Sequence, residues 1–147
     1  LLKLQTFSCC NFYAKKTFIM IKPDGIKRGL TGNIIQRYEQ KGLKIIAAKL
    51  CNVTKELAEK HYYEHISKPF FGELIAYITS GPVMAMVVEG DNAIKLARIL
   101  NGATRVEEAM PGTIRGDFAT STTKNLVHAS DSAESAKREI SLWFPHL

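Results

Sequence analysis

The 147-residue chain lacks any apolar run close to the ~20 residues that a helix needs to cross a bilayer, so no transmembrane helix is expected. It is also poor in cysteine. Cys9 and Cys10 are adjacent and Cys51 stands alone, without a CxxC pair or a paired framework. This pattern argues against disulfide bonds and favours a reducing compartment, and we expect the protein to be cytoplasmic.

Arginine is absent from the first sixteen residues, which also lack the charged segment and long apolar stretch of a secretory signal. We interpret residues 1–16 as an N-terminal extension. A remnant of an organelle-targeting sequence is the alternative, although such presequences are usually richer in arginine. Residues 17–147 suffice for one globular domain and are too few for two.

The composition is that of an ordinary soluble protein, with 46% hydrophobic and 23% charged residues. The formal net charge of +6 suits an anionic partner, whether nucleotide, nucleic acid or an anionic surface, and does not choose among them. A nucleotide site of the P-loop kind is excluded. Gly32 is followed by Asn33 and Ile34, whereas a Walker A motif needs a lysine and a hydroxyl residue there.

Four short segments rich in β-branched and apolar residues predict strands at 17–21, 43–53, 83–88 and 125–128. Apolar residues three or four positions apart predict helices between and after them, and the most regular of these patterns ends at Trp143. We expect irregular structure at residues 23–32 and 103–123. Strands interleaved with helices indicate an α/β sandwich, α+β in class, in which helices cover one sheet.

The segment NLVHASDS, residues 125–132, places His128 at the end of the last predicted strand, just before the last helix. The first turn of a helix has unpaired N–H groups and the positive end of the peptide dipoles, so it attracts phosphate. A neutral imidazole beside such a site has a free lone pair and could accept a phosphoryl group. The alternative is a strand-end histidine with a structural role.

Four other residues where predicted elements end suit a phosphate-binding site: Lys22, Arg98, Thr104 and Arg115. Arginine holds phosphate oxygens in a planar fork, and lysine adds a point charge. Each residue taken alone is typical of a solvated surface. Their common position at element ends favours the phosphate site.

Glu139 should lean toward the inner side of the last helix, where a carboxylate needs a partner. Orienting His128 or Ser130 would supply one, because a nucleophilic histidine needs its second ring nitrogen protonated and held. A salt-bridged glutamate is the alternative. A competing hypothesis is a zinc site at HYYEH, residues 61–65, which matches the HxxEH pattern but would need a third ligand.

Four segments together resemble nucleoside diphosphate kinases: TFIMIKPDGIKRG, KPFFGELIAYITSGPVMAMVVEG, PGTIRGDF and NLVHASDSAESAKREISLWF. The similarity runs from about Thr17 to Phe144, with the motifs in order. It implies a ferredoxin-like βαββαβ fold with a four-stranded antiparallel sheet. It also implies a ping-pong reaction, in which the γ-phosphate of a nucleoside triphosphate passes to His128 and then to a nucleoside diphosphate.

The resemblance implies roles for individual side chains. Those at the nucleotide are Lys22 and Asn125 at the ribose, Arg98, Thr104 and Arg115 at the phosphates, and Phe70 and Leu74 at the base. Those around the histidine are Tyr62 beside it, Ser130 and Glu139 as a supporting pair, and Asp131 near a water of Mg²⁺. Magnesium would arrive with the nucleotide phosphates. Stacking without hydrogen bonds to base edges would tolerate every base.

Three positions depart from the pattern of the family. Ala129 follows the histidine where glycine is frequent, and Thr122 replaces an apolar residue that faces the base. Thr104-Arg105-Val106 replaces a common Thr-Asn-Pro in a loop that touches neighbouring subunits of the homo-oligomer, a hexamer or a tetramer. A nucleic-acid-binding or scaffold role remains the alternative function, because of the +6 charge.

Overall fold

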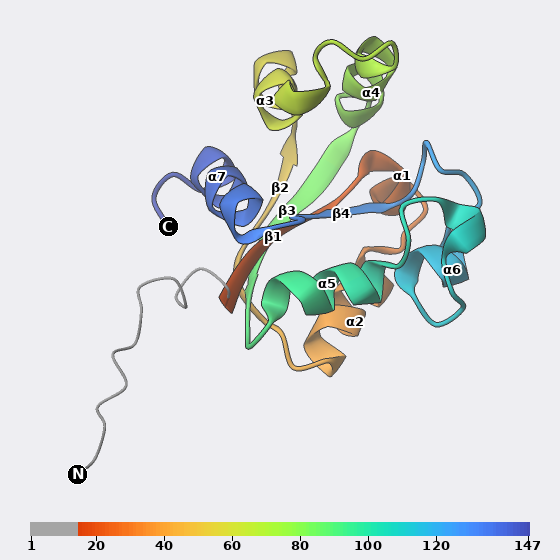
Figure 1. Ribbon diagram of the computed structural model, residues 1–147, viewed down its shortest axis with the longest axis vertical. Coiled ribbons are helices and arrows are strands. Elements are labelled where there is room, and N and C mark those ends of the chain that lie inside the picture. Colours follow the sequence, from red (N-terminus) through yellow and green to blue (C-terminus); the bar gives the residue numbers. More distant parts are fainter. Residues whose placement is uncertain (1–14) are drawn as a thin grey trace.

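The structure, a computed structural model, describes residues 15–147 (Figure 1). Residues 1–14, with Cys9, Cys10 and most of the predicted extension, lie outside the described part. The four predicted strands are confirmed as β1 (Lys16–Ile21), β2 (Lys44–Asn52), β3 (Pro82–Glu89) and β4 (Val127–Ala129). They form one sheet in the order β2-β3-β1-β4, with every neighbouring pair antiparallel.

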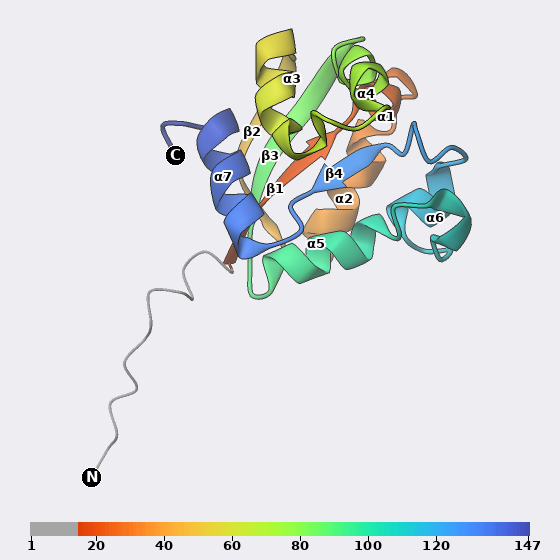
Figure 2. The same ribbon diagram turned by 45° about the horizontal axis from the view of Figure 1, so that its top comes forward.

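Helices connect and cover these strands. Over residues 15–147 they are α1 (Pro23–Lys27), α2 (Thr31–Gln40), α3 (Lys55–His61), α4 (Phe71–Ile78), α5 (Ala93–Asn101), α6 (Ile114–Phe118) and α7 (Ala133–Trp143), with short 3-10 turns η3 (Tyr63–His65) and η4 (Val106–Glu108). In Figures 1 and 2, α2 and α5 lie on one face of the sheet, and α3, α4 and α7 lie on the other. This arrangement confirms the ferredoxin-like α+β sandwich. None of the helices described is long and apolar enough to span a membrane.

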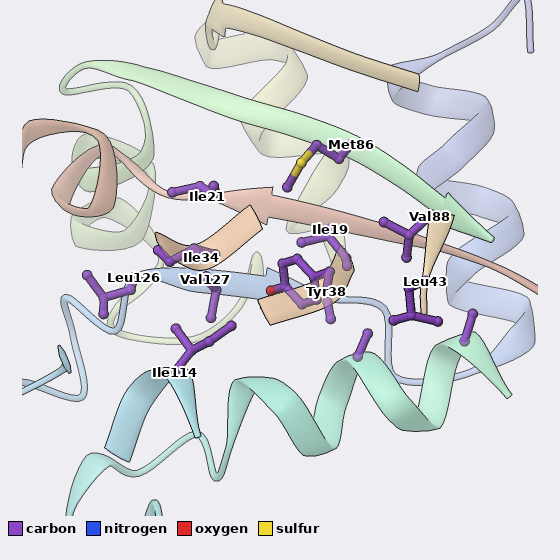
Figure 3. Close-up of a cluster of buried hydrophobic side chains, with 13 residues drawn as sticks. Ile19, Ile21, Ile34, Tyr38, Leu43, Met86, Val88, Ile114, Leu126 and Val127 are labelled. Carbon is purple, nitrogen blue, oxygen red and sulfur yellow. The ribbon is translucent and has the colours of Figure 1, made fainter. Parts of the chain in front are cut away.

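Strand β1 separates two hydrophobic clusters, because alternate side chains of a strand point to opposite faces of a sheet. Ile19 and Ile21 pack with Tyr38 of α2 and with residues of α5 and α6 (Figure 3). Phe18 and Met20 belong to the second cluster, which includes residues of α3, α4 and α7. Since both faces of β1 are covered, its residues 18–21 are all apolar rather than alternating.

Two segments that the sequence suggested were irregular contain short helices. α1 begins at Pro23, whose fixed φ suits the first turn of a helix. α6 lies within residues 103–123, and the Thr113 hydroxyl caps it by accepting a hydrogen bond from the N–H of Gly116. Gly116 is needed inside this helix, because a Cβ there would lie 1.9 Å from the carbonyl oxygen of Met110.

Candidate active site

A cavity of about 450 Å³ lies between the α3–α4 segment, the loops around α6 and the end of β4. His128 of β4 lines it, together with Tyr62 and every residue that the resemblance assigns to the nucleotide. The latter are Lys22, Phe70, Leu74, Arg98, Thr104, Arg115 and Asn125. A larger hollow of about 810 Å³ lies along α5, but apart from Arg98 and Asp131 it contains none of the predicted site residues.

The packing of α7 on the sheet brings Glu139 against His128. Nε2 of His128 is hydrogen-bonded to Oε1 of Glu139. The carboxylate is buried, whereas the histidine side chain is 24% exposed. Because a carboxylate can only accept, Nε2 is the nitrogen that carries a proton, and Nδ1 is the one on which a lone pair can lie.

The turn before β4 is strained. Leu126 is fully buried at φ +73°, a conformation that costs a non-glycine residue roughly 1–3 kcal/mol. Its N–H donates to Oδ2 of Asp24 at 3.2 Å, and its carbonyl accepts from the N–H of Lys22 at 2.7 Å. The Tyr77 hydroxyl also donates to the Asp24 carboxylate. These bonds place Asn125 beside the Lys22 side chain, at the entrance to β4.

Two arginines hold the backbone on either side of His128. Arg115 donates to the carbonyl of Val127 at 2.7 Å and to two further loop carbonyls. Arg98 donates to the carbonyl of Ala129 at 3.2 Å. A guanidinium has five N–H donors, so two of those on Arg115 and most of those on Arg98 remain for a ligand.

The cations of this cavity are buried and lie close to one another. Burial, and then the charge of Arg115, lower the pKa of Lys22 to about 8, while Asp24 opposes the shift. Burial also lowers the pKa of Arg115 itself. Crowded, partly desolvated cations repel one another, and an anionic ligand would relieve that cost. A phosphate group is therefore the ligand chemistry that the cavity favours.

Four buried side-chain atoms of the described residues have no hydrogen-bond partner, and two of them belong to predicted site residues: the hydroxyl oxygen of Tyr62 and Oε2 of Glu139. Burial raises the pKa of Tyr62, and the negative charge of Glu139 raises it further. Buried polar groups are nearly always paired. These two atoms therefore mark places where substrate or water is expected to bind.

Ser130 and Asp131 lie outside the 450 Å³ cavity. The Ser130 hydroxyl is buried and donates to the carbonyl of Phe18 at 3.5 Å rather than to Glu139, with which the resemblance pairs it. Asp131 lines another cavity, of about 250 Å³, which His128 and Glu139 also line. A hydrogen bond from Ser135 is the main cause of the lowered pKa of Asp131, so this carboxylate is ionised at neutral pH.

The aromatic ring of Phe70 lines the 450 Å³ cavity. Phe70 is 47% exposed, its ring is 5.8 Å from that of His65, and the Lys68 ammonium lies 5.6 Å from it. Thr122 lines the same cavity, as the resemblance implies, but its hydroxyl also accepts a hydrogen bond from the N–H of Val106 at 3.2 Å. Two of the three departures from the family pattern are therefore in direct contact.

Sequence reasoning considered His61 only as a zinc ligand. It is buried at the end of α3, and its Nε2 lies 3.7 Å from Oε1 of Glu139. His65 of the HxxEH pattern does not join it, because the cluster of metal-type ligands found in residues 15–147 consists of His61, His128 and Glu139. Tyr77, which also lines the nucleotide cavity, was not predicted either, and no local signal marks it.

The sandwich fold, together with a histidine set among phosphate-binding cations, defines a nucleotide-binding phosphotransferase. A family model described as nucleoside diphosphate kinase matches residues 15–147. A nucleoside diphosphate kinase of Caldanaerobacter subterraneus subsp. tengcongensis is 64% identical over 135 residues, covering 92% of this chain and 97% of that protein. The chain belongs to the nucleoside diphosphate kinase family, and it is an enzyme that transfers the terminal phosphate of a nucleoside triphosphate to a nucleoside diphosphate.

More distant relatives agree. A nucleoside diphosphate kinase of Archaeoglobus fulgidus is 62% identical over 130 residues, covering 88% of this chain and 86% of that protein. The crystal structure of the apo enzyme of Encephalitozoon cuniculi superposes with a TM-score of 0.87 at 48% identity, covering 88% of each chain. The halophilic enzyme of Halobacterium salinarum, in complex with CDP, gives a TM-score of 0.86 at 50% identity, covering 88% of this chain and 87% of that one.

Proposed function

We propose that the enzyme works by a ping-pong mechanism in which His128 carries the phosphoryl group between two nucleotides. One observation carries the proposal: Nε2 of His128 is hydrogen-bonded to the buried carboxylate of Glu139. That contact leaves Nδ1 as the free nitrogen of a side chain that lines the nucleotide cavity.

The first half-reaction is an attack of Nδ1 on the γ-phosphorus of a nucleoside triphosphate. The N–P bond forms as the bond between the γ-phosphorus and the β–γ bridging oxygen breaks, and its electron pair leaves with the diphosphate. The second half-reaction reverses these steps on another diphosphate. The phosphorylated imidazole is cationic, and the Glu139 carboxylate at Nε2 stabilises that charge.

The other residues of the cavity bind and orient the nucleotide. Negative charge is spread over the phosphate oxygens during transfer, so fixed cations lower the barrier. In our proposal Arg98, Thr104 and Arg115 bind the phosphates, Lys22 and Asn125 meet the ribose hydroxyls, and the unpaired hydroxyl of Tyr62 gains a partner beside the histidine. Phe70 and Leu74 contact the base, and stacking on a ring accepts any base.

Magnesium is the cofactor that we propose, bound mainly by the nucleotide phosphates. The protein residue that fits it is Asp131, an ionised carboxylate in the 250 Å³ cavity that His128 also lines, which would hold a water of the ion. When bound, the ion neutralises phosphate charge. Ser130 is proposed to support the histidine through the backbone of β4, since its hydroxyl reaches β1.

We further propose a homo-oligomer, with a hexamer favoured over a tetramer. Large apolar side chains that are at least half exposed support it: Leu50 on the edge strand β2, Ile99 on α5 and Met110. The other proposals rest on the sequence: a domain at residues 17–147 after an extension at 1–16, a cytoplasmic location, and nucleic acid as a secondary anionic partner of the +6 chain.

The experiment that tests the mechanism is labelling with γ-labelled ATP. The enzyme should form an acid-labile, alkali-stable phosphoprotein, and His128→Ala should form none and should lose exchange between nucleotides. His146→Ala is the matched control, because His146 is exposed near the C-terminus. A His128→Ala protein that is still labelled, or that still turns over nucleotide, would show that another residue carries the phosphate.

A further inference from the structure

One histidine beside the site, His61, is buried, and the phosphotransfer described above does not use it. The ring of His61 is packed among the rings of His128, Tyr62 and Trp143, at centroid distances of 4.7, 4.6 and 5.6 Å. The residue is 4% exposed. A buried imidazole must satisfy two ring nitrogens, so its contacts define what it can do.

Trp143 determines which nitrogen of His61 carries the proton. The indole Nε1–H can only donate, and it donates to Nδ1 of His61 at 3.1 Å. Nδ1 therefore holds a lone pair. Burial is the largest cause that lowers the pKa of His61 well below its usual value, followed by the charges of His128 and Arg138, so the ring is neutral. Its one proton must lie on Nε2, the nitrogen 3.7 Å from Oε1 of Glu139.

We propose that His61 is a positioning residue for phosphotransfer: the dipole of its Nε2–H, whose place the Trp143 hydrogen bond fixes, attracts the Glu139 carboxylate over 3.7 Å and orients it toward Nε2 of His128. This inference rests on the proposed role of His128. Two hydrogen bonds and one electrostatic contact link the four side chains: Trp143 donates to His61, His128 is hydrogen-bonded to Glu139, and Nε2 of His61 lies 3.7 Å from Oε1 of Glu139. This arrangement keeps the lone pair of His128 on Nδ1.

A neutral donor is the group that this location requires. Glu139 is buried and must offset the positive charge that His128 gains on phosphorylation. A cation at His61 would compete for that carboxylate, whereas a neutral N–H orients it without cancelling its charge. The Trp143 hydrogen bond also disfavours a metal ion at His61, His128 and Glu139. A metal ion would need a lone pair on Nε2 of His61, and that nitrogen carries the proton because Nδ1 accepts from Trp143.

Three variants separate positioning from packing. His61→Phe fills the space without donor or acceptor, whereas His61→Gln can accept from Trp143 and donate to Glu139. Trp143→Phe removes the donor that fixes the tautomer. Single-turnover phosphorylation by ATP should slow about 10- to 100-fold in His61→Phe, with KM changed less than about twofold, and His61→Gln should recover most of the rate.

The ¹⁵N spectrum of the imidazoles gives a readout that a packing role would not change. In the unsubstituted enzyme, His61 should show the tautomer with the proton on Nε2, and Trp143→Phe should show both tautomers. This spectrum decides the matter even if His61→Phe fails to fold. A proton on Nδ1 of His61, or a folded His61→Phe that is phosphorylated at the normal rate, would overturn the proposal.

The labelling site distinguishes this failure from failure of the mechanism. If phosphate is found on His128 and His61→Phe reacts normally, only the positioning role is wrong. If phosphate is found on another residue, the proposed mechanism is wrong as well.

Discussion

Nζ of Lys22 donates a 2.8 Å hydrogen bond to Oδ1 of Asn125. The bond joins the end of β1 to the strained turn that leads into β4, across 103 positions of the chain. The bond holds two residues that are proposed to bind the nucleotide in place before any nucleotide binds. It also keeps an ammonium group in a buried position, 8% exposed, where charge is costly.

The first prediction concerns the cost of that charge. The pKa of Lys22 is about 8 in the folded protein and 10.5 in its reference state, so the unfolded chain binds more protons between these values. Lys22 therefore lowers the free energy of unfolding most below about pH 8, and this penalty disappears as the pH rises toward 10.5. We expect Lys22→Met to be more stable than the unsubstituted enzyme at pH 7 by roughly 1–3 kcal/mol, while nucleotide binding weakens.

Urea unfolding at pH 7 and pH 10 measures this effect. The advantage of Lys22→Met should shrink at the higher pH. Lys27→Met, a change at an exposed lysine five residues later, should alter stability little at either pH. An advantage that is equal at both pH values would show that desolvation of the ammonium is not its source.

The second prediction concerns the double task of Arg115. Its three hydrogen bonds to backbone carbonyls spread over a planar fork that a lysine ammonium cannot reproduce. Arg115→Lys should lose roughly 1–3 kcal/mol of unfolding free energy in addition to at least about tenfold in kcat/KM. Arg98→Lys should lose activity with a smaller change in Tm, since Arg98 is exposed and bonds one carbonyl. An Arg115→Lys protein as stable as Arg98→Lys would contradict the structural half of this account.

The third prediction concerns Thr122 and Val106. Val106 supplies an N–H that a proline at that position would lack, and Thr122 supplies the hydroxyl that accepts it. Thr122→Val should leave that N–H without a partner, whereas Val106→Pro removes the N–H itself. A proline is tolerated at position 106, because Arg105 before it has the extended backbone that a following proline needs. The double variant should be more stable than the sum of the single effects predicts, by about 0.5–1 kcal/mol.

Chemical unfolding of the four proteins completes this double-mutant cycle. Additive effects would mean that the two departures from the family pattern are independent. The effects of the two substitutions on the KM for ATP should also be non-additive, because Thr122 lines the nucleotide cavity.

The fold was predictable where one local signal dominates. The run from Phe18 to Ile21 is apolar on both faces because it lies between two hydrophobic clusters, and its strand followed from composition alone. α1 and α6 were missed because their sequences contain turn residues. Pro23 suits a helix start as well as a turn, and Gly116 is required by the nearby Met110 carbonyl, a contact that only folding creates.

The candidate site also has some features that the sequence predicts and others that depend on tertiary packing. The buried, inward position of Glu139 followed from spacing, whereas His128 was expected at the end of a strand and is the middle residue of β4. The assignments around the nucleotide came from resemblance. No local pattern could show that Trp143 donates to His61, because the two residues lie 82 positions apart. The hydrogen bonds from Arg98 and Arg115 to the carbonyls beside His128 likewise form only through tertiary packing.

We propose that His128 accepts phosphate on Nδ1 because Glu139 occupies Nε2. The direct test is NMR of the ¹⁵N-labelled phosphoenzyme, prepared with ATP and kept alkaline, in which coupling to phosphorus identifies the nitrogen that carries it. The account predicts one phosphate per chain, on Nδ1 of His128. Phosphate on Nε2 of His128, or on any other residue, would contradict it.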